Sequence, residues 1–293
     1  MLALGIAAAL AAPDQYVPHN PENEFERWAA GHTTGPIVHK DSHYFEVYKR
    51  HFGPARAAWH ARRRAGDGRP FQLVEIGVQS GGSLEMWKSY FGEDAHLHGI
   101  DINPATRQFT NRSRHIQVHV GSTSDDDFMQ RLVRRLPLID IVIDDGSHHS
   151  LDIWRAFTVL YPLLRTSGGV YLAEDLHTNY WLNAEFQERG EGFSFINRAK
   201  TLVDELNAYD VSDKRFNPRR FARDSPLSGL QPTAFTNSTA SIHFYNGVVV
   251  MEKQERTGPF VDVQLGSLKV GHSHLEHKRP PGTPTARPRL RGV

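Results

Sequence analysis

Apolar residues occur along the chain in two alternating patterns: short continuous runs, and longer stretches in which they recur at helical spacing. Short runs rich in Val, Ile and Leu are typical of buried strands in a parallel sheet. Strands that alternate with helices predict a parallel sheet with helices on both faces. The predicted strands are residues 71–78, 96–102, 115–121, 137–145 and 169–175, and the helices between them are residues 83–91, 125–136 and 151–164.

The spacing of apolar residues and the content of Pro and Gly also predict the structure of two regions before the first strand. Residues 43–64 carry aromatic side chains at helical spacing, but Gly53 and Pro54 interrupt the pattern, which predicts two short helices. Residues 13–40 are rich in Pro, Asn and Gly and predict a loop. The regular part of the fold should therefore begin near residue 43.

The end of the sheet is predicted from residues 240–252, which hold two apolar runs joined at Asn246-Gly247. This dipeptide suits the two-residue turn of a β-hairpin. We expect the antiparallel hairpin to close one edge of the sheet. The predicted fold class is therefore α/β, with a mostly parallel, seven-stranded sheet, helices on both faces and a terminal antiparallel hairpin.

The chain is expected to divide into three segments. Residues 1–24 form an N-terminal extension whose first part resembles the apolar core of a signal peptide, although no Lys or Arg precedes it. Residues 25–265 form the main domain. Its insertion at about 176–238 contains one amphipathic helix, residues 193–209, and suits a lid or a substrate-recognition element, with structural filler as the alternative. Residues 266–293 are predicted to be a disordered basic tail.

Composition narrows the function. The chain has no cysteine, which excludes disulfides, thiolate zinc sites and cysteine nucleophiles. A net charge of +1 with neutral histidines gives no general attraction to nucleic acid or membranes. We expect no nucleic-acid partner, no stable membrane span and a cytoplasmic location, with a secretory organelle as the alternative if the N-terminal stretch is a targeting segment. Homo-oligomerisation is left open.

A glycine-rich turn follows the first predicted strand. Gly77 and Gly81 follow a G-x-x-x-G-G spacing, which differs from the G-x-G-x-x-G of dinucleotide enzymes. The acidic Glu75 before the turn suits a cationic ligand better than a pyrophosphate. Asp101 ends the second strand, where an acid can accept hydrogen bonds from ribose hydroxyls. A nucleoside ligand with cationic character is S-adenosylmethionine; the alternative is a plain strand–turn–helix with incidental acids.

Paired acids end the next two predicted strands. Asp144 and Asp145 end the fourth strand, and Glu174 and Asp175 end the fifth. If these strands are neighbours, four carboxylates meet at one sheet edge, and like charges in one place disfavour ionising all of them. A divalent cation resolves this conflict, and oxygen ligands favour Mg²⁺, Mn²⁺ or Ca²⁺. The alternative is that the acids cap the following helices.

Two histidines follow the first acidic pair within one turn. A neutral imidazole there can take the proton of a substrate hydroxyl, because its pKa lies near the working pH. We assign this role to His148 rather than to His149. The alternative is a histidine that only supports the site.

Five sequence strings together resemble one known family. They are EIGVQSGGSLEMWKSYF, GIDINP, DIVIDDGSHH, GGVYLAEDLHTNYW and ASIHFYNGVVVMEK, and they lie in order within roughly residues 25–255. They are similar to the metal-dependent sugar O-methyltransferases of macrolide biosynthesis, of the mycinamicin and demethylmacrocin type. The resemblance implies a Rossmann-like class I methyltransferase fold.

The resemblance also assigns roles to residues. It implies that Asp145, Glu174 and Asp175 hold Mg²⁺ or Mn²⁺ and that His148 is the catalytic base. It places either Ser122 or Asp125 beside the adenine of S-adenosylmethionine. The residues expected to bind this cofactor are Glu75, Gly77, Gly81, Ser83, Asp101, Ser122 and Asp144.

The predicted function is therefore an S-adenosylmethionine-dependent and divalent-metal-dependent O-methyltransferase. Its acceptor would be a hydroxyl of a sugar or a polyhydroxylated natural product, because a vicinal diol can chelate the ion. The Arg-rich insertion and the basic tail differ from the antibiotic enzymes, which leaves the acceptor open. Two alternatives remain: a cephalosporin-hydroxylase-like oxidoreductase, and a non-catalytic nucleoside-binding module on the same fold.

Overall fold

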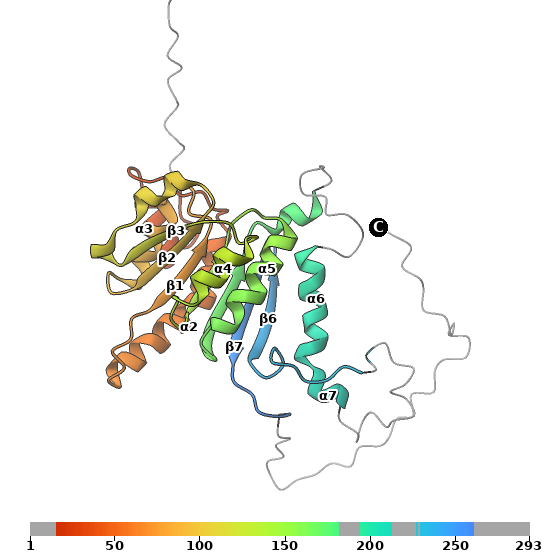
Figure 1. Cartoon of the computed structure of the whole chain (residues 1–293). Helices are drawn as coiled ribbons and strands as arrows, with labels where there is room; N and C mark the ends of the chain where they lie inside the picture. The colour runs from red at the N-terminus through yellow and green to blue at the C-terminus, as the bar shows by residue number, and fades with distance from the viewer. Residues whose placement is uncertain (1–15, 182–193, 213–226, 228, 261–293) are drawn as a thin grey trace, which may run out of the picture. The chain divides into compact units, whose positions relative to one another are not determined.

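A seven-stranded sheet forms the centre of the protein (Figure 1). The computed structural model describes residues 16–181, 194–212, 227 and 229–260. The strand order is β3-β2-β1-β4-β5-β7-β6, and β7 runs antiparallel to both of its neighbours while the other pairs are parallel. The predicted α/β class with a terminal hairpin is confirmed. The strands are β1 Gln72–Ile76, β2 His96–Asp101, β3 Ile116–Val120, β4 Ile141–Asp144, β5 Ser167–Ala173, β6 Thr239–Tyr245 and β7 Val248–Gln254.

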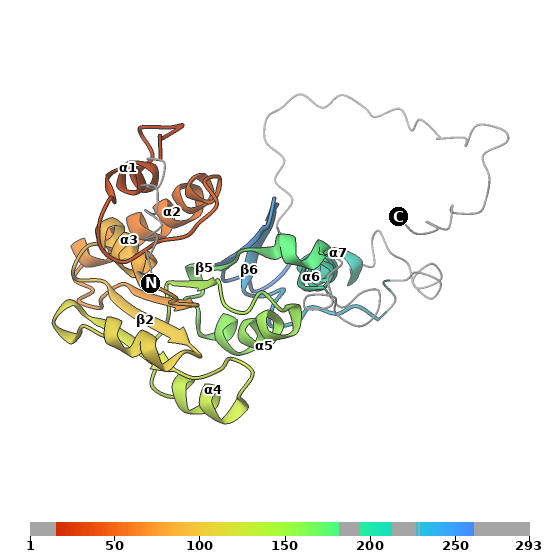
Figure 2. The same ribbon diagram turned by 90° about the horizontal axis from the view of Figure 1, so that it is seen from above.

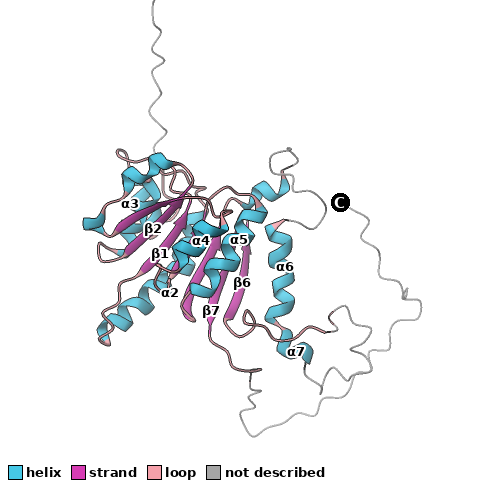
Figure 3. Ribbon diagram, viewed as in Figure 1, coloured by secondary structure: helices cyan, strands magenta, loops and turns pink. Residues whose placement is uncertain are grey.

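Helices cover both faces of this sheet (Figures 2 and 3). On β1, Leu73 belongs to a buried cluster that includes side chains of α1, α2 and α3, whereas Val74 belongs to a second cluster that includes side chains of α4, α5 and α6. Successive residues of a strand point to opposite faces, so both faces of this buried strand are apolar. The helices are α1 Glu24–Gly31, α2 Tyr44–Arg64, α3 Gly82–Phe91, α4 Asp126–Val133, α5 Ser150–Leu160, α6 Phe195–Leu206 and α7 Ala208–Ser212.

The prediction of two short helices over residues 43–64 is wrong, because α2 continues through Pro54. Proline removes one helical hydrogen bond and usually kinks or ends a helix. Here the buried face carries on across it, with Phe52 before the proline and Trp59 after it both at most 2% exposed. Burial of this aromatic face outweighs the lost hydrogen bond.

The prediction of an uninterrupted loop over residues 13–40 is also wrong, because it contains α1. The side chain of Asn23 caps this helix by accepting a hydrogen bond from the N–H of Phe25 at 3.0 Å. Phe25 is 1% exposed and stacks on Tyr90 of α3. After α1 the chain runs back to the sheet, where Ile37 accepts a hydrogen bond from the N–H of Gly82.

The single helix predicted at 193–209 is confirmed in place but not in extent, because the chain leaves the helical conformation at Asn207 and forms two helices, α6 and α7. Much of the rest of the predicted insertion, the first residues of the chain and the predicted tail at 266–293 lie outside the described residues. The division into segments stays a prediction. No helix in the described part of the chain combines the length and the apolar character that a membrane crossing requires.

Candidate active site

A cavity of about 540 Å³ lies at the carboxyl ends of the parallel strands. Open α/β sheets bind ligands at this edge. The lining comes from the ends of β1 and β2, from the segments that follow the five parallel strands β1 to β5, and from His39. The predicted site residues that line it are Gly77, Asp101, Ser122, Asp145, His148 and Asp175.

The turn after β1 brings three strand ends together. Gly77 has φ +90°, and a Cβ atom at this position would lie 1.9 Å from the carbonyl oxygen of Asp145. Its N–H donates a hydrogen bond to the carbonyl of Ile100 at 2.8 Å. Only glycine allows this backbone conformation with so close an approach. The missing side chain therefore lets the backbone after β4 pack directly against the turn, at the lining of the cavity.

Asp101 organises the same turn. Its Oδ2 accepts hydrogen bonds from the N–H groups of Val78 and Gln79, both at 2.9 Å, and its Oδ1 accepts one from Asn103 at 2.7 Å. A carboxylate has about four acceptor positions, so capacity remains for a hydroxyl of a bound ligand. The residue predicted to bind a ribose therefore lines the cavity and also holds the turn.

Two other predicted cofactor residues lie behind the turn. Glu75 is fully buried and accepts hydrogen bonds from Ser83 Oγ at 2.8 Å and Trp87 Nε1 at 2.9 Å. Burial raises the pKa of Glu75 to about 7, although the Lys40 ammonium opposes this shift. Neither Glu75 nor Ser83 lines the cavity. The structure assigns them to support of α3 and the turn, and a direct contact with the cofactor stays a prediction.

Gly81 and Asp144 also lie away from the cavity lining. Gly81 precedes α3 with φ +78°, and a Cβ atom there would meet the ring of Phe109 at 2.7 Å. Asp144 is 3% exposed and accepts a hydrogen bond from the Tyr171 hydroxyl at 2.8 Å. Burial raises the pKa of Asp144 to about 7. Asp144 therefore serves the packing between β4 and β5, while its neighbour Asp145 faces the site.

Of the two residues predicted to lie beside the adenine, the structure favours Ser122 over Asp125. Asp125 is the N-cap of α4, and its side chain accepts a hydrogen bond from the N–H of Phe128 at 3.0 Å. Ser122 lines the cavity. The capping role that acids often take thus applies to Asp125, and the adenine contact stays a prediction for Ser122 alone.

A lysine that sequence reasoning missed lies among the acids. Lys40 Nζ contacts Asp145 Oδ2 at 2.5 Å and also Glu174 Oε1. Its side chain is 3% exposed, and that of Glu174 is 0% exposed. Burial lowers the pKa of Lys40, but the carboxylates outweigh this and hold the pKa well above its ordinary value. The ammonium therefore neutralises charge that the sequence analysis had assigned to a metal ion alone.

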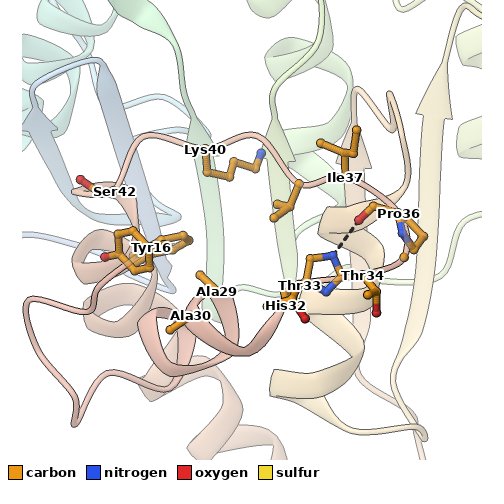
Figure 4. Close-up of a pocket in the computed structure, with 13 residues that line it drawn as sticks. Tyr16, Ala29, Ala30, His32, Thr33, Thr34, Pro36, Ile37, Lys40 and Ser42 are labelled. Atoms are coloured by element: carbon orange, nitrogen blue, oxygen red, sulfur yellow. Dashed lines mark hydrogen bonds between the residues drawn. The ribbon is translucent and has the colours of Figure 1, made fainter. Parts of the chain in front are cut away.

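Lys40 also belongs to a second cavity, of about 650 Å³ (Figure 4). Its labelled lining includes hydroxyl-bearing side chains from the segment around α1, among them Tyr16, Thr33 and Ser42. Because the ammonium of Lys40 contacts Asp145, which lines the first cavity, this lysine connects the linings of the two cavities.

His148 and Asp175 lie close to each other in the lining of the first cavity. His148 Nε2 lies 3.7 Å from Asp175 Oδ2, and Asp175 Oδ1 accepts a hydrogen bond from the Tyr44 hydroxyl at 2.7 Å. Among the described residues His148 Nδ1 is buried without a hydrogen-bond partner. Burial lowers the pKa of His148. Both residues have positive φ, +59° for His148 and +55° for Asp175, a strain that often marks functional sites.

The predicted metal ligands are brought together in part. One ligand atom from each of Asp145, His148 and Asp175 lies within 4.8 Å of the others. Two carboxylates and an imidazole are donors that a divalent cation accepts. Glu174 lies next to this group but bonds to Lys40 and to the Tyr48 hydroxyl. His149, the second histidine of the motif, is the N-cap residue of α5.

Comparison with known proteins identifies the class. Residues 74–176 match a family model described as a methyltransferase domain. The match begins within β1 and ends one residue after Asp175. The chain therefore carries a methyltransferase domain, built on the Rossmann-like sheet described above. Its curated relatives include O-methyltransferases of a rhamnosyl tetracenomycin and of mycinamicin VI, which confirms the predicted resemblance.

Two curated relatives show how far this similarity extends. The 8-demethyl-8-alpha-L-rhamnosyl tetracenomycin-C 2'-O-methyltransferase of Streptomyces olivaceus is 33% identical over 222 residues, which are 73% of this chain and 51% of that protein. The mycinamicin VI 2''-O-methyltransferase of Micromonospora griseorubida is 31% identical over 191 residues, which are 62% and 43%. The chain thus spans about half the length of the curated relatives it matches.

A solved structure shows the same arrangement. The MycE methyltransferase from the mycinamycin biosynthetic pathway, solved in complex with Mg, SAH and mycinamycin VI, superposes with a TM-score of 0.58 at 25% identity. The match covers 79% of this chain and 53% of that one.

Proposed function

We propose that the protein is an S-adenosylmethionine-dependent and divalent-metal-dependent O-methyltransferase that acts on a hydroxyl of a sugar or a polyhydroxylated natural product. One observation carries the proposal. A single cavity has a glycine turn and Asp101 in its lining, as well as the group Asp145, His148 and Asp175. A nucleoside cofactor and a deprotonating site would thus be neighbours. The relatives support the acceptor class, since one is a 2'-O-methyltransferase of a rhamnosyl tetracenomycin and another a 2''-O-methyltransferase of mycinamicin VI.

The cofactor would bind along the strand ends. Asp101 would accept hydrogen bonds from the ribose hydroxyls, and Ser122 would lie beside the adenine. The methionine part would lie along the turn at Gly77, which lines the cavity next to Asp145. The carboxylate of Asp145, which also lines the cavity, would favour the positive sulfonium.

The donor set suits a divalent ion, and the MycE complex contains Mg. Asp145 and Asp175 would hold the ion, with Glu174 as the third carboxylate predicted from the sequence. When bound, Mg²⁺ would lower the pKa of a coordinated substrate hydroxyl. Lys40 bonds to two of these carboxylates, so its ammonium and the ion are competitors for the same oxygens.

His148 would act as the base. In a neutral imidazole one nitrogen carries the proton and the other a lone pair. His148 lines the cavity beside Asp175, whose carboxylate would stabilise the imidazolium that forms when the ring takes a proton. His148 would take the hydroxyl proton, the oxygen would form a bond to the methyl carbon, and the carbon–sulfur bond would break to release S-adenosylhomocysteine. Alignment of the two reactants would supply much of the rate.

Turnover tests this proposal. Purified protein is mixed with S-adenosylmethionine carrying a deuterated methyl group and with rhamnosylated polyketides and macrolides, and the products are analysed by mass spectrometry. We expect one labelled methyl group on the sugar in Mg²⁺, and none with EDTA or with Asp145→Asn. A product formed equally well in EDTA contradicts the metal, and methylation of the aglycone alone contradicts the acceptor class.

A further inference from the structure

A second group of metal-ligating side chains lies outside the candidate active site. It is formed by His51 of α2, His243 of β6 and Glu252 of β7. His51 Nδ1 lies 2.7 Å from Glu252 Oε1, and His243 Nε2 lies 3.4 Å from Glu252 Oε2. One ligand atom from each of the three residues lies within 4.8 Å of the others. Three elements distant in sequence thus present three donors to one point.

The orientation of His51 is already that of a metal ligand. Its Nδ1 faces Glu252, while its Nε2 lies 2.8 Å from the hydroxyl of Tyr245. Histidines that bind metals use one ring nitrogen for the ion and bond the other to an oxygen, which fixes the ring. His51 is 2% exposed, so surrounding side chains also hold the ring in place.

The other two ligands leave the group open to solvent. The side chains of His243 and Glu252 are 36% and 32% exposed. The hydrogen bond with His51 lowers the pKa of Glu252 to about 2, so this carboxylate is ionised at neutral pH. The hydroxyl of Ser241 lies 2.9 Å from both Glu252 Oε2 and His243 Nε2. An ion could therefore enter from outside and keep a water or the Ser241 hydroxyl as its fourth ligand.

We propose that His51, His243 and Glu252 form a binding site for a transition-metal ion of the Zn²⁺ type, which joins α2 to the β6–β7 hairpin. Two imidazoles and one carboxylate are a donor set that Zn²⁺ takes with one further ligand. Imidazole donors select Zn²⁺, Cu²⁺ or Ni²⁺ over Mg²⁺. The site differs in this from the oxygen-rich group around Asp145, and the inference is independent of the proposed function.

The ion would tie the edge of the sheet to the helix beneath it. β6 is the edge strand, and the turn of its hairpin contacts the segment after Asp175, since Gly247 accepts a hydrogen bond from the N–H of Leu176 at 2.9 Å. A ligand that binds only the folded protein stabilises it by mass action. Zn²⁺ should therefore raise the melting temperature.

Zinc titration of the full chain tests the proposal. His272, His274 and His277 are changed to Gln in every sample, because histidines near the end of the sequence can bind Zn²⁺ themselves. Excess Mg²⁺ is present to occupy the candidate active site. This parent protein is compared by calorimetry and thermal melting with His243→Gln. The matched control is His60→Gln, an exposed histidine on the same helix α2.

We expect the parent and His60→Gln to bind one Zn²⁺ equally and to melt at a higher temperature with the ion. His243→Gln should bind Zn²⁺ at least about ten-fold more weakly than the parent and should lose the shift in melting temperature. His243 is partly exposed, so this variant should fold, and its circular dichroism without metal checks that. Equal affinity in the parent and His243→Gln, or no Zn²⁺ binding by the parent, would overturn the proposal. Co²⁺ absorption in the visible range, present in the parent and lost in His243→Gln, gives a second readout.

Discussion

Replacing Lys40 with Met should lower the free energy of unfolding by about 3–5 kcal/mol when divalent cations are absent. The ammonium of Lys40 bonds to Asp145 and Glu174, whose side chains are only 18% and 0% exposed. Methionine keeps an apolar stem of similar shape but removes the charge. The two carboxylates then face each other without a cation in a place that water reaches poorly, which is costly unless they take up protons.

The same variant distinguishes the stabilisation that Lys40 provides from the stabilisation that a metal ion provides. Urea unfolding is measured for both proteins in EDTA and in excess Mg²⁺. We expect Mg²⁺ to stabilise Lys40→Met more than the unchanged protein, because the ion no longer competes with the ammonium. Lys200→Met, a change at an exposed lysine of α6, serves as the control and should leave both measurements unchanged. An identical effect of Mg²⁺ on the two proteins would show that ion and lysine do not share these oxygens.

His148→Asn should lower kcat by about 10²–10⁴-fold, the usual contribution of a positioned general base. Asparagine cannot take the proton, but it tolerates the left-handed backbone that His148 adopts at φ +59°. Binding of S-adenosylmethionine should change little, so the loss should appear in single-turnover rates and not in calorimetry.

The adjacent histidine provides a matched control for this variant. His149 is the N-cap residue of α5, a position where Asn is favourable, so His149→Asn should keep its activity. Equal losses in the two variants would point to a structural role for the whole loop. Full activity of His148→Asn would remove His148 as the base.

The parts of the site that follow from strand periodicity were predictable. Parallel strands end at one edge, so acids after β4 and β5 had to meet there, and Asp145 and Asp175 do so together with His148. The same periodicity separates adjacent residues of a strand. Asp144 and Asp145 point to different surroundings for this reason, and the first belongs to the packing around Tyr171.

The parts that depend on contacts between distant segments were not predictable. Nothing near Lys40 in the sequence indicates that it meets Asp145, 105 positions further along the chain. The pairing of Glu75 with Ser83 and Trp87 depends on how α3 packs on β1, which spacing alone does not fix. The helix α1 was missed because Pro, Asn and Gly surround it, while burial of its aromatic face decides its structure.

Calorimetric titration of the protein with S-adenosylmethionine, with and without Mg²⁺, tests the central claim most directly. Asp101→Asn is the site variant, and Asp94→Asn, at a carboxylate whose side chain is 68% exposed, is the control. The account predicts that S-adenosylmethionine binds the unchanged protein and Asp94→Asn equally. Asp101→Asn should bind it about ten-fold to a hundred-fold more weakly, the loss expected for hydrogen bonds to a charged group. Absence of S-adenosylmethionine binding in both buffers, with binding of NADH in its place, would contradict the account.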